Sequence, residues 1–171
     1  MNAIKLIPAD DPDTILPGGS PFQAYLRIRA LCAGAISQVE IFDPWLDAQI
    51  YHLYVCEIGK EVAITVVTSK EIMEDNKYKT RRARIDAVSS LLAAERPDTY
   101  KFIVTSEQHD RHLRVDGKIL HLGGSLKDAS KKAPYTITGL GSTQSNNQFL
   151  DSVIELGDEW FGPSTNTHST S

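Results

Sequence analysis

Length, composition and charge limit the classes of protein to which this sequence can belong. Its 171 residues fit a single domain, and the hydrophobic fraction of 41% and charged fraction of 23% are ordinary for a globular protein. The net charge of −4 at pH 7 argues against a protein that coats nucleic acid with a uniformly basic surface. No apolar run approaches the roughly 20 residues that cross a bilayer, and the first five residues lack the features of a signal peptide.

The two cysteines, Cys32 and Cys56, lie in apolar segments with helical spacing, which predicts buried small side chains rather than a disulfide or a metal pair. These features together predict a cytoplasmic protein. We expect one domain over residues 1–163, followed by a disordered polar tail over 164–171.

In chain order, a loop rich in proline and glycine over 9–19 leads into a first helix. Ser20 and Pro21 are typical of a helix start, and apolar residues then recur at helical spacing to residue 36. The predicted elements that follow are a strand over 39–42, a helix over 45–58, a strand over 62–67, a helix over 78–95, a strand over 100–104, a hairpin, a strand over 135–138 and a helix over 149–161. Strands that alternate with helices predict an α/β fold, with a mixed, mostly parallel sheet and helices on both faces.

The hairpin has the clearest local signal. Asp116 and Gly117 form a favoured two-residue type I′ turn between the alternating runs 112–115 and 118–122. This turn predicts the register of the two strands, in which Val115 faces Lys118, Leu113 faces Leu120 and His112 faces His121.

A group of polar residues near this hairpin points to phosphate chemistry. His109 and Arg111 are two residues apart and are expected on one side of the strand, level with Gly123-Gly124-Ser125 on the returning strand. An arginine can neutralise phosphate oxygens with its planar fork, and a histidine can attack phosphorus or move protons. The glycines would let an oxyanion approach the backbone, where a serine hydroxyl can add a hydrogen bond.

These residues resemble the signature of the phospholipase D superfamily, which reads H-x-K-x4-D followed by G-S-x-N. Residues 109–116 read HDRHLRVD, and Gly124-Ser125 follow. The resemblance implies a phospholipase D-like sandwich, in which the catalytic residues are His109, Arg111 and Asp116 and the phosphate-binding residues are Gly124, Ser125 and Lys127. The sequence departs from the signature in three ways: Arg111 replaces Lys, Lys127 stands where Asn is expected, and the spacer after Asp116 is one residue longer.

The resemblance also implies a mechanism. In this family a histidine is the nucleophile and forms a phosphohistidine, and a second histidine protonates the leaving group. The chain holds one copy of the motif, so the resemblance implies a homodimer that acts without metal or other cofactor on nucleic acid or another phosphodiester. A nuclease of this kind would suit bacterial defence against phage.

A second interpretation remains open. The run H-D-R-x4-[DN] also resembles the degenerate phospholipase D-like domain at the C-terminus of some MIT proteins. That domain binds phosphoinositides, so this chain would bind a phosphorylated lipid, a nucleotide or nucleic acid without cleaving it.

Three further features carry competing interpretations. The basic residues Lys77, Lys79, Arg81, Arg82 and Arg84 would guide a nucleic acid backbone or form a solvated helix face, and the second is favoured. Trp45 is expected to anchor its helix in the core rather than to stack on a base. The pair His112 and His121 is expected to be a cross-strand contact rather than half of a metal site.

Overall fold

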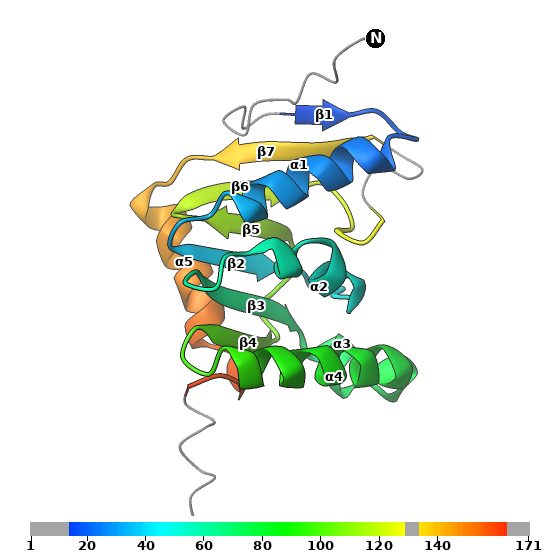
Figure 1. Ribbon diagram of the computed structural model, residues 1–171. Coiled ribbons are helices and arrows are strands. Elements are labelled where there is room, and N and C mark those ends of the chain that lie inside the picture. Colours follow the sequence, from blue (N-terminus) through cyan, green and yellow to red (C-terminus); the bar gives the residue numbers. More distant parts are fainter. Residues whose placement is uncertain (1–13, 129–133, 164–171) are drawn as a thin grey trace, which may run out of the picture.

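An eight-stranded sheet organises the part of the chain that the computed structural model describes, residues 14–128 and 134–163 (Figure 1). In spatial order the strands are β1-β7-β6-β5-β2-β3-β4-β8. Their bounds are β1 Thr14–Leu16, β2 Gln38–Phe42, β3 Ala63–Ser69, β4 Tyr100–Thr105, β5 Arg111–Val115, β6 Lys118–Leu122, β7 Tyr135–Leu140 and β8 Asp158–Phe161. The expected tail over 164–171 and residues 9–13 of the expected first loop lie outside the described residues.

Parallel pairing is confined to the centre of this sheet. β2 pairs with β3 and β3 with β4 in parallel, whereas the five other neighbouring pairs are antiparallel. The expectation of a mostly parallel sheet is therefore corrected to a mixed sheet in which antiparallel pairs dominate. The physical reason is that β5, β6 and β7 follow one another without a crossover helix, and such connections produce antiparallel neighbours.

Helices cover both faces of the sheet, as expected. α1 (Pro21–Ala33), α2 (Gln49–Leu53) and α4 (Lys79–Glu95) lie in front of the sheet in Figure 1, and α5 (Gln144–Glu155) lies behind it. The short helices are α3 (Lys70–Glu74) and the 3-10 turns η1 (Val55–Glu57) and η2 (Asn76–Tyr78). None of the helices within the described ranges combines the length and the apolar character needed to cross a bilayer.

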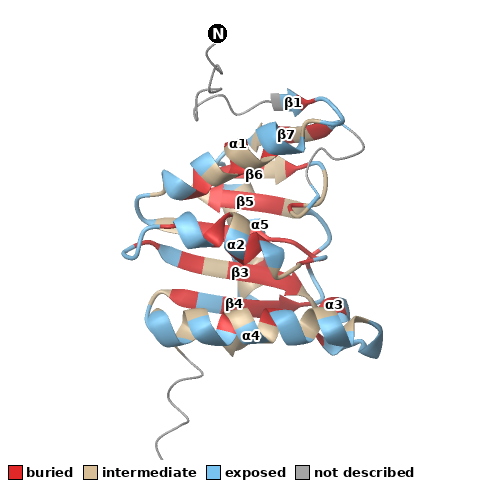
Figure 2. Ribbon diagram, turned by 45° about the vertical axis from the view of Figure 1, so that its right-hand side comes forward, coloured by how far each residue is buried: buried red, intermediate tan, exposed pale blue. Residues whose placement is uncertain are grey.

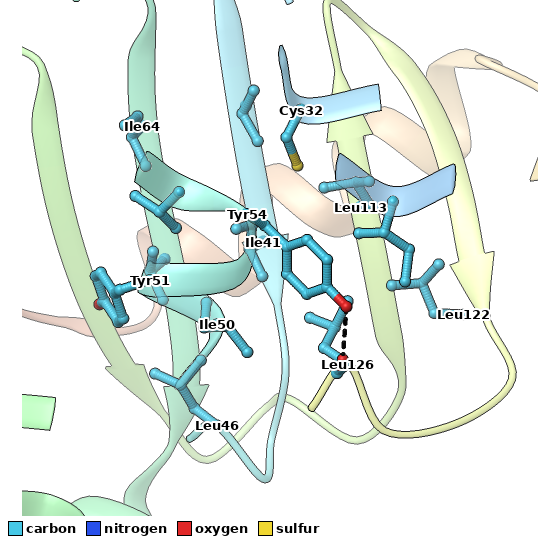
Figure 3. Packing of buried hydrophobic residues seen from close by; sticks show 14 of the residues in the cluster. Cys32, Ile41, Leu46, Ile50, Tyr51, Tyr54, Ile64, Leu113, Leu122 and Leu126 are labelled. Atoms are coloured by element: carbon cyan, nitrogen blue, oxygen red, sulfur yellow. Dashed lines mark hydrogen bonds between the residues drawn. The ribbon is translucent and has the colours of Figure 1, made fainter. Parts of the chain in front are cut away.

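The alternation of side chains along the strands divides the core into two parts. Ile41 and Leu113 belong to the larger part, which packs against α1 and α2 (Figure 3). Phe42 points to the other face and packs with Leu150 and Val153 of α5. Because helices cover both of their faces, the central strands are buried along most of their length (Figure 2).

The hairpin prediction is confirmed. β5 and β6 pair with the expected register, including His112 opposite His121. Asp116 and Gly117 have positive φ values of 49° and 83°, as a type I′ turn requires.

Several element predictions are corrected. β1 lies inside the predicted loop 9–19, and α2 and η1 replace one helix over 45–58. The last helix begins at Gln144, after the capping side chain of Thr143, and 158–161 form a strand instead of its end. Gly157 lets the chain turn back tightly against β4, since a Cβ there would collide with the Ile103 side chain. Cys32 is buried as expected, but Cys56 is exposed.

Candidate functional site

The candidate site lies where the parallel strands end. The carboxyl ends of β2, β3 and β4 meet at the right-hand edge of the sheet in Figure 1, together with the start of β5 and the loop that follows β6. In open α/β sheets, ligands bind in the crevice outside the carboxyl ends of the strands. Most of the site residues that the sequence motif implies lie at this edge: Arg111, Gly124, Ser125 and Lys127, with His109 just before β5.

Arg111 is anchored by a buried carboxylate. Its Nε donates to Asp43 Oδ1 at 3.0 Å, and Asp43, which directly follows β2, is only 2% exposed. The backbone nitrogen of Trp45 donates to the same oxygen at 2.9 Å. Burial raises the pKa of the Asp43 carboxyl, and the neighbouring Arg111 guanidinium opposes that shift. Asp43 therefore orients Arg111, and the Arg111 guanidinium in turn favours the ionised form of the buried Asp43 carboxyl.

The outer end of Arg111 is available to a ligand. The side chain of Arg111 is 22% exposed, and neither of its Nη atoms has a hydrogen-bond partner among the residues that the structure describes. Two parallel N–H groups of one guanidinium match two oxygens of a phosphate. Arg111 can thus hold a phosphate with one side of its fork while Asp43 holds the other.

Arg114, three residues along the same strand, shows the opposite arrangement. It is 4% exposed and bonds to Glu40, to Asp151 Oδ1 at 2.6 Å and to Asn147 Oδ1 at 3.0 Å. Its donors are directed to protein groups on the α5 face of the sheet. Arg114 is therefore structural, and it provides a comparison for Arg111.

His109 lies in the connection between β4 and β5 and is exposed. Because β5 begins at Arg111, the regular alternation that would put His109 and Arg111 on one side does not extend to His109. No described residue makes a hydrogen bond or an ion pair with its imidazole. The neighbouring Gln108 is buried and donates to the backbone oxygen of Asp110, which ties down the chain beside His109.

Asp116 does not join this group, and its expected catalytic placement is corrected. It lies at the hairpin turn, five residues from Arg111 along the strand, or about 16 Å at the usual rise per residue. Its carboxylate accepts hydrogen bonds from the backbone nitrogens of Ile36, Ser37 and Gln38 at 2.8, 2.7 and 3.0 Å, and from the Ser37 hydroxyl at 2.8 Å. Burial alone would raise the pKa of Asp116, but these hydrogen bonds hold it well below its ordinary value. Asp116 fastens the start of β2 to the hairpin, which is a structural role.

The glycines after β6 have a packing role in the structure. A Cβ on Gly123 would collide with the Thr136 side chain, and one on Gly124 would meet the Tyr135 ring at 3.1 Å. The Tyr135 hydroxyl also donates to the Gly124 oxygen at 3.3 Å. Ser125 is half-buried, and its Oγ accepts from the Asp128 nitrogen at 3.3 Å, which leaves its own proton for another acceptor.

Lys127 is less available than its expected role requires. Its Nζ lies 3.4 Å from Asp47 Oδ2, which also lies 3.8 Å from Arg81 Nε. Through these two contacts, Asp47 links the loop after β6 to the start of α4 at the same edge of the sheet. A phosphate at this edge would compete with Asp47 for both cations.

Solved structures show what this fold resembles, although no protein-family model and no curated protein matches the sequence. The chain is similar to Nuc, a phospholipase D family member from Salmonella typhimurium, with 13% identity and a TM-score of 0.59 over 88% of this chain and 99% of Nuc. The chain has a phospholipase D-like fold.

Two other solved structures are also similar to the chain. Phosphatidylserine synthase from Haemophilus influenzae Rd KW20 matches with 12% identity and a TM-score of 0.58, over 90% of this chain and 40% of the synthase. TrmBL2, an archaeal chromatin protein with a novel mode of DNA binding, matches with 11% identity and a TM-score of 0.57 over 88% of this chain. The match covers 54% of TrmBL2, so this chain spans about half the length of that protein.

Two residues of this candidate site were not predicted from the sequence. Asp43 directly follows the predicted strand over 39–42 and was given no role, although a carboxylate at the end of a buried strand is a signal for an anchored cation. Trp45 was expected in the core, but it is 43% exposed, because α2 begins four residues later and leaves Trp45 in the preceding turn.

The pair His112 and His121 adds no further group to the site. His112 and His121 contact each other with ring centroids 5.5 Å apart, as expected for a cross-strand pair. Within residues 14–128 and 134–163, no three His, Cys, Asp or Glu side chains are grouped to hold a metal ion.

Proposed function

We propose that this protein is a metal-independent phosphodiesterase of the nuclease type, which uses His109 as nucleophile and Arg111 to bind the phosphate. The observation that carries the proposal is the position of Arg111. It is held by the buried carboxylate of Asp43, its outer nitrogens have no partner among the described residues, and the exposed His109 precedes it by two residues.

The proposed chemistry needs two histidines, so we propose a homodimer in which His109 of each copy faces the other. One imidazole nitrogen attacks phosphorus, a P–N bond forms, and the P–O bond to the leaving group breaks. The leaving oxygen takes a proton from the imidazolium of the second copy. Water then attacks the phosphohistidine, the second histidine accepts the proton from that water, and the P–N bond breaks to release a phosphomonoester. Arg111 neutralises the charge that gathers on the phosphate oxygens.

Nucleic acid is the substrate class that we favour. The similar fold of TrmBL2, whose structure is described as showing DNA binding, supports this choice. So do Lys77 in η2 and Lys79 at the start of α4, because Arg81 of the same helix lies 3.8 Å from Asp47 at this edge. We place such a nuclease in the cytoplasm, where defence against phage DNA or RNA would use it.

A binding module without turnover is the second candidate. The observation that favours it is that no described residue holds the tautomer or the orientation of the His109 imidazole, which an efficient nucleophile needs. In that case Arg111 would hold a phosphoinositide, a nucleotide or a nucleic acid, and His109 would be a minor contact.

The test is an activity panel in EDTA with plasmid, single-stranded DNA, RNA and a chromogenic phosphodiester as substrates. The proposal expects cleavage of at least one substrate by the wild type and none by His109→Ala. Binding without cleavage by the wild type would reject the enzyme and support the binding module. Cleavage that His109→Ala retains would place the chemistry elsewhere.

A further inference from the structure

The backbone of an exposed tryptophan lies close to the anchored arginine. Trp45 is 43% exposed, and its backbone nitrogen shares Asp43 Oδ1 with Arg111 Nε. Hydrogen bonds of 2.9 and 3.0 Å to one oxygen place these two nitrogens within about 6 Å of each other. A ligand that reaches the outer nitrogens of Arg111 therefore comes close to the turn that carries Trp45.

The Trp45 indole packs against an aromatic ring that has cationic side chains beside it. The Tyr78 ring lies edge-on to Trp45, with a centroid distance of 6.1 Å and an interplanar angle of 66°. Lys77 Nζ lies 5.0 Å and Arg81 Cζ 5.7 Å from the centroid of the Tyr78 ring. We call Trp45, Tyr78, Lys77 and Arg81 the Trp45 shelf.

The Trp45 shelf has the chemistry that suits unpaired bases. Proteins that bind single strands combine cations along the backbone with exposed aromatic rings on which bases stack. Tyr78 already has cations near its ring, so Trp45 is the residue of the shelf that offers an aromatic surface to a ligand. A lipid headgroup has no flat ring to stack, and the bases of a duplex are already stacked on each other.

The carboxylates near the shelf limit what charge alone can contribute. Asp47 lies against Arg81, and Glu71 accepts a hydrogen bond from the Tyr78 hydroxyl at 3.4 Å. The positive charge of the shelf is therefore partly balanced, so its contribution to binding should come mainly from stacking, in addition to the phosphate contact at Arg111.

We infer that the Trp45 shelf stacks a base of single-stranded nucleic acid whose backbone phosphate is held by Arg111. This inference rests on the proposed phosphate site, and it gives that site a preference for single strands with bases over duplexes and over other phosphodiesters.

The test compares three labelled probes of equal length by fluorescence anisotropy: a thymidine oligomer, an abasic oligomer and a duplex. Trp45→Ala should weaken binding of the thymidine oligomer by about tenfold or more, which is the usual effect of removing one stacking aromatic. It should leave the abasic oligomer and the duplex unchanged, and Trp45→Phe should restore most of the loss. The matched control is Phe149→Ala, which removes a 57% exposed aromatic on α5, on the other face of the sheet, and should change nothing.

The outcomes separate this inference from the proposed function. Thymidine binding by Trp45→Ala that equals the wild type overturns the inference, even if Arg111→Ala loses all three probes and so supports the phosphate site. An equal loss of all three probes in Trp45→Ala also overturns it, because that pattern reports a structural effect. Wild-type affinity in Arg111→Ala overturns the phosphate site, and with it the part of the inference that pairs the shelf with Arg111.

Discussion

Removing the Arg111 side chain tests the geometry on which the site depends. Arg111→Ala leaves the Asp43 carboxylate in place, with a side chain that is 3% exposed and only the Trp45 backbone nitrogen to bond it. Breaking a buried ion pair by removing one partner typically destabilises a protein by about 3–5 kcal/mol. Because the Arg111 side chain is 22% exposed and partly screened by water, we expect a smaller loss than that range, about 2–3 kcal/mol, at pH 7.

The loss should depend on pH, with a sign that follows from burial. Burial raises the pKa of the Asp43 carboxyl in the folded state, and without Arg111 only the Trp45 backbone hydrogen bond and the charge of Arg81 oppose that shift. The folded state then binds the proton more tightly than the unfolded state, whose carboxyl has a pKa of about 3.9. The Asp43 contribution to stability is therefore fully present below about pH 4 and is lost as the pH rises through the folded-state pKa. Most of the deficit of Arg111→Ala should appear at pH 7 and little at pH 4.

The double variant completes this prediction. Asp43→Asn in the Arg111→Ala background removes the uncompensated charge, so it should recover most of the stability at pH 7 without recovering phosphate binding. Urea unfolding of the wild type, both single variants and the double variant at pH 7 and pH 4 gives the comparison. An Arg111→Ala deficit that is equal at both pH values, or that Asp43→Asn fails to relieve, would refute the role assigned to Asp43.

Three other predictions follow from the same structure. His109→Ala should lower turnover by on the order of a thousandfold or more, while substrate binding stays within a few-fold. Arg111→Lys should keep only part of the turnover, since one ammonium cannot hold Asp43 and two phosphate oxygens together. Steady-state kinetics and anisotropy titrations measure both effects, and unchanged kinetics in both variants would show that the site lies elsewhere. Asp116→Ala should destabilise the fold by about 2 kcal/mol at pH 7, because it removes the hydrogen bonds that fasten β2 to the hairpin. Since those bonds lower the pKa of Asp116, the loss of stability in Asp116→Ala should shrink as the pH falls below about 4, the ordinary range of an aspartate. Thermal melts that show equal stability of Asp116→Ala and the wild type at pH 7 would contradict the structural role of Asp116. Light scattering at ~50 μM, well above the dissociation constants of stable dimers, should show a homodimer, and a monomer at that concentration would count against the two-histidine mechanism.

Local sequence signals predicted the hairpin because its rules act over a few residues. The Asp116-Gly117 turn fixes which residues face each other, and the two-residue period of the strand carries that register to His112 and His121. The same local rules put Arg111 next to the predicted strand 112–115, but they did not show that this strand starts where the parallel strands end.

The long-range parts of the site had no local signal. Asp43 lies 68 residues before Arg111, so only the pairing of β2 with β5 brings them together. The exposure of Trp45 depends on where α2 begins, and periodicity extended that helix over Trp45. The motif resemblance predicted Asp116 as a catalytic residue, but the length of β5 separates Asp116 from Arg111. The end of the last helix was missed because β8 pairs with β4, a contact that helical spacing within residues 149–161 does not reveal.

The most direct test of the central claim is to trap the covalent intermediate on His109. An oligonucleotide with an internal radioactive phosphate is mixed with the protein in EDTA, quenched in base, in which a phosphohistidine is stable, and digested for peptide mapping. The proposed mechanism predicts label on the peptide that contains His109 in the wild type, loss of the label on acid treatment, and no label in His109→Ala. Substrate that binds the wild type and leaves neither a labelled peptide nor a cleaved product would contradict it.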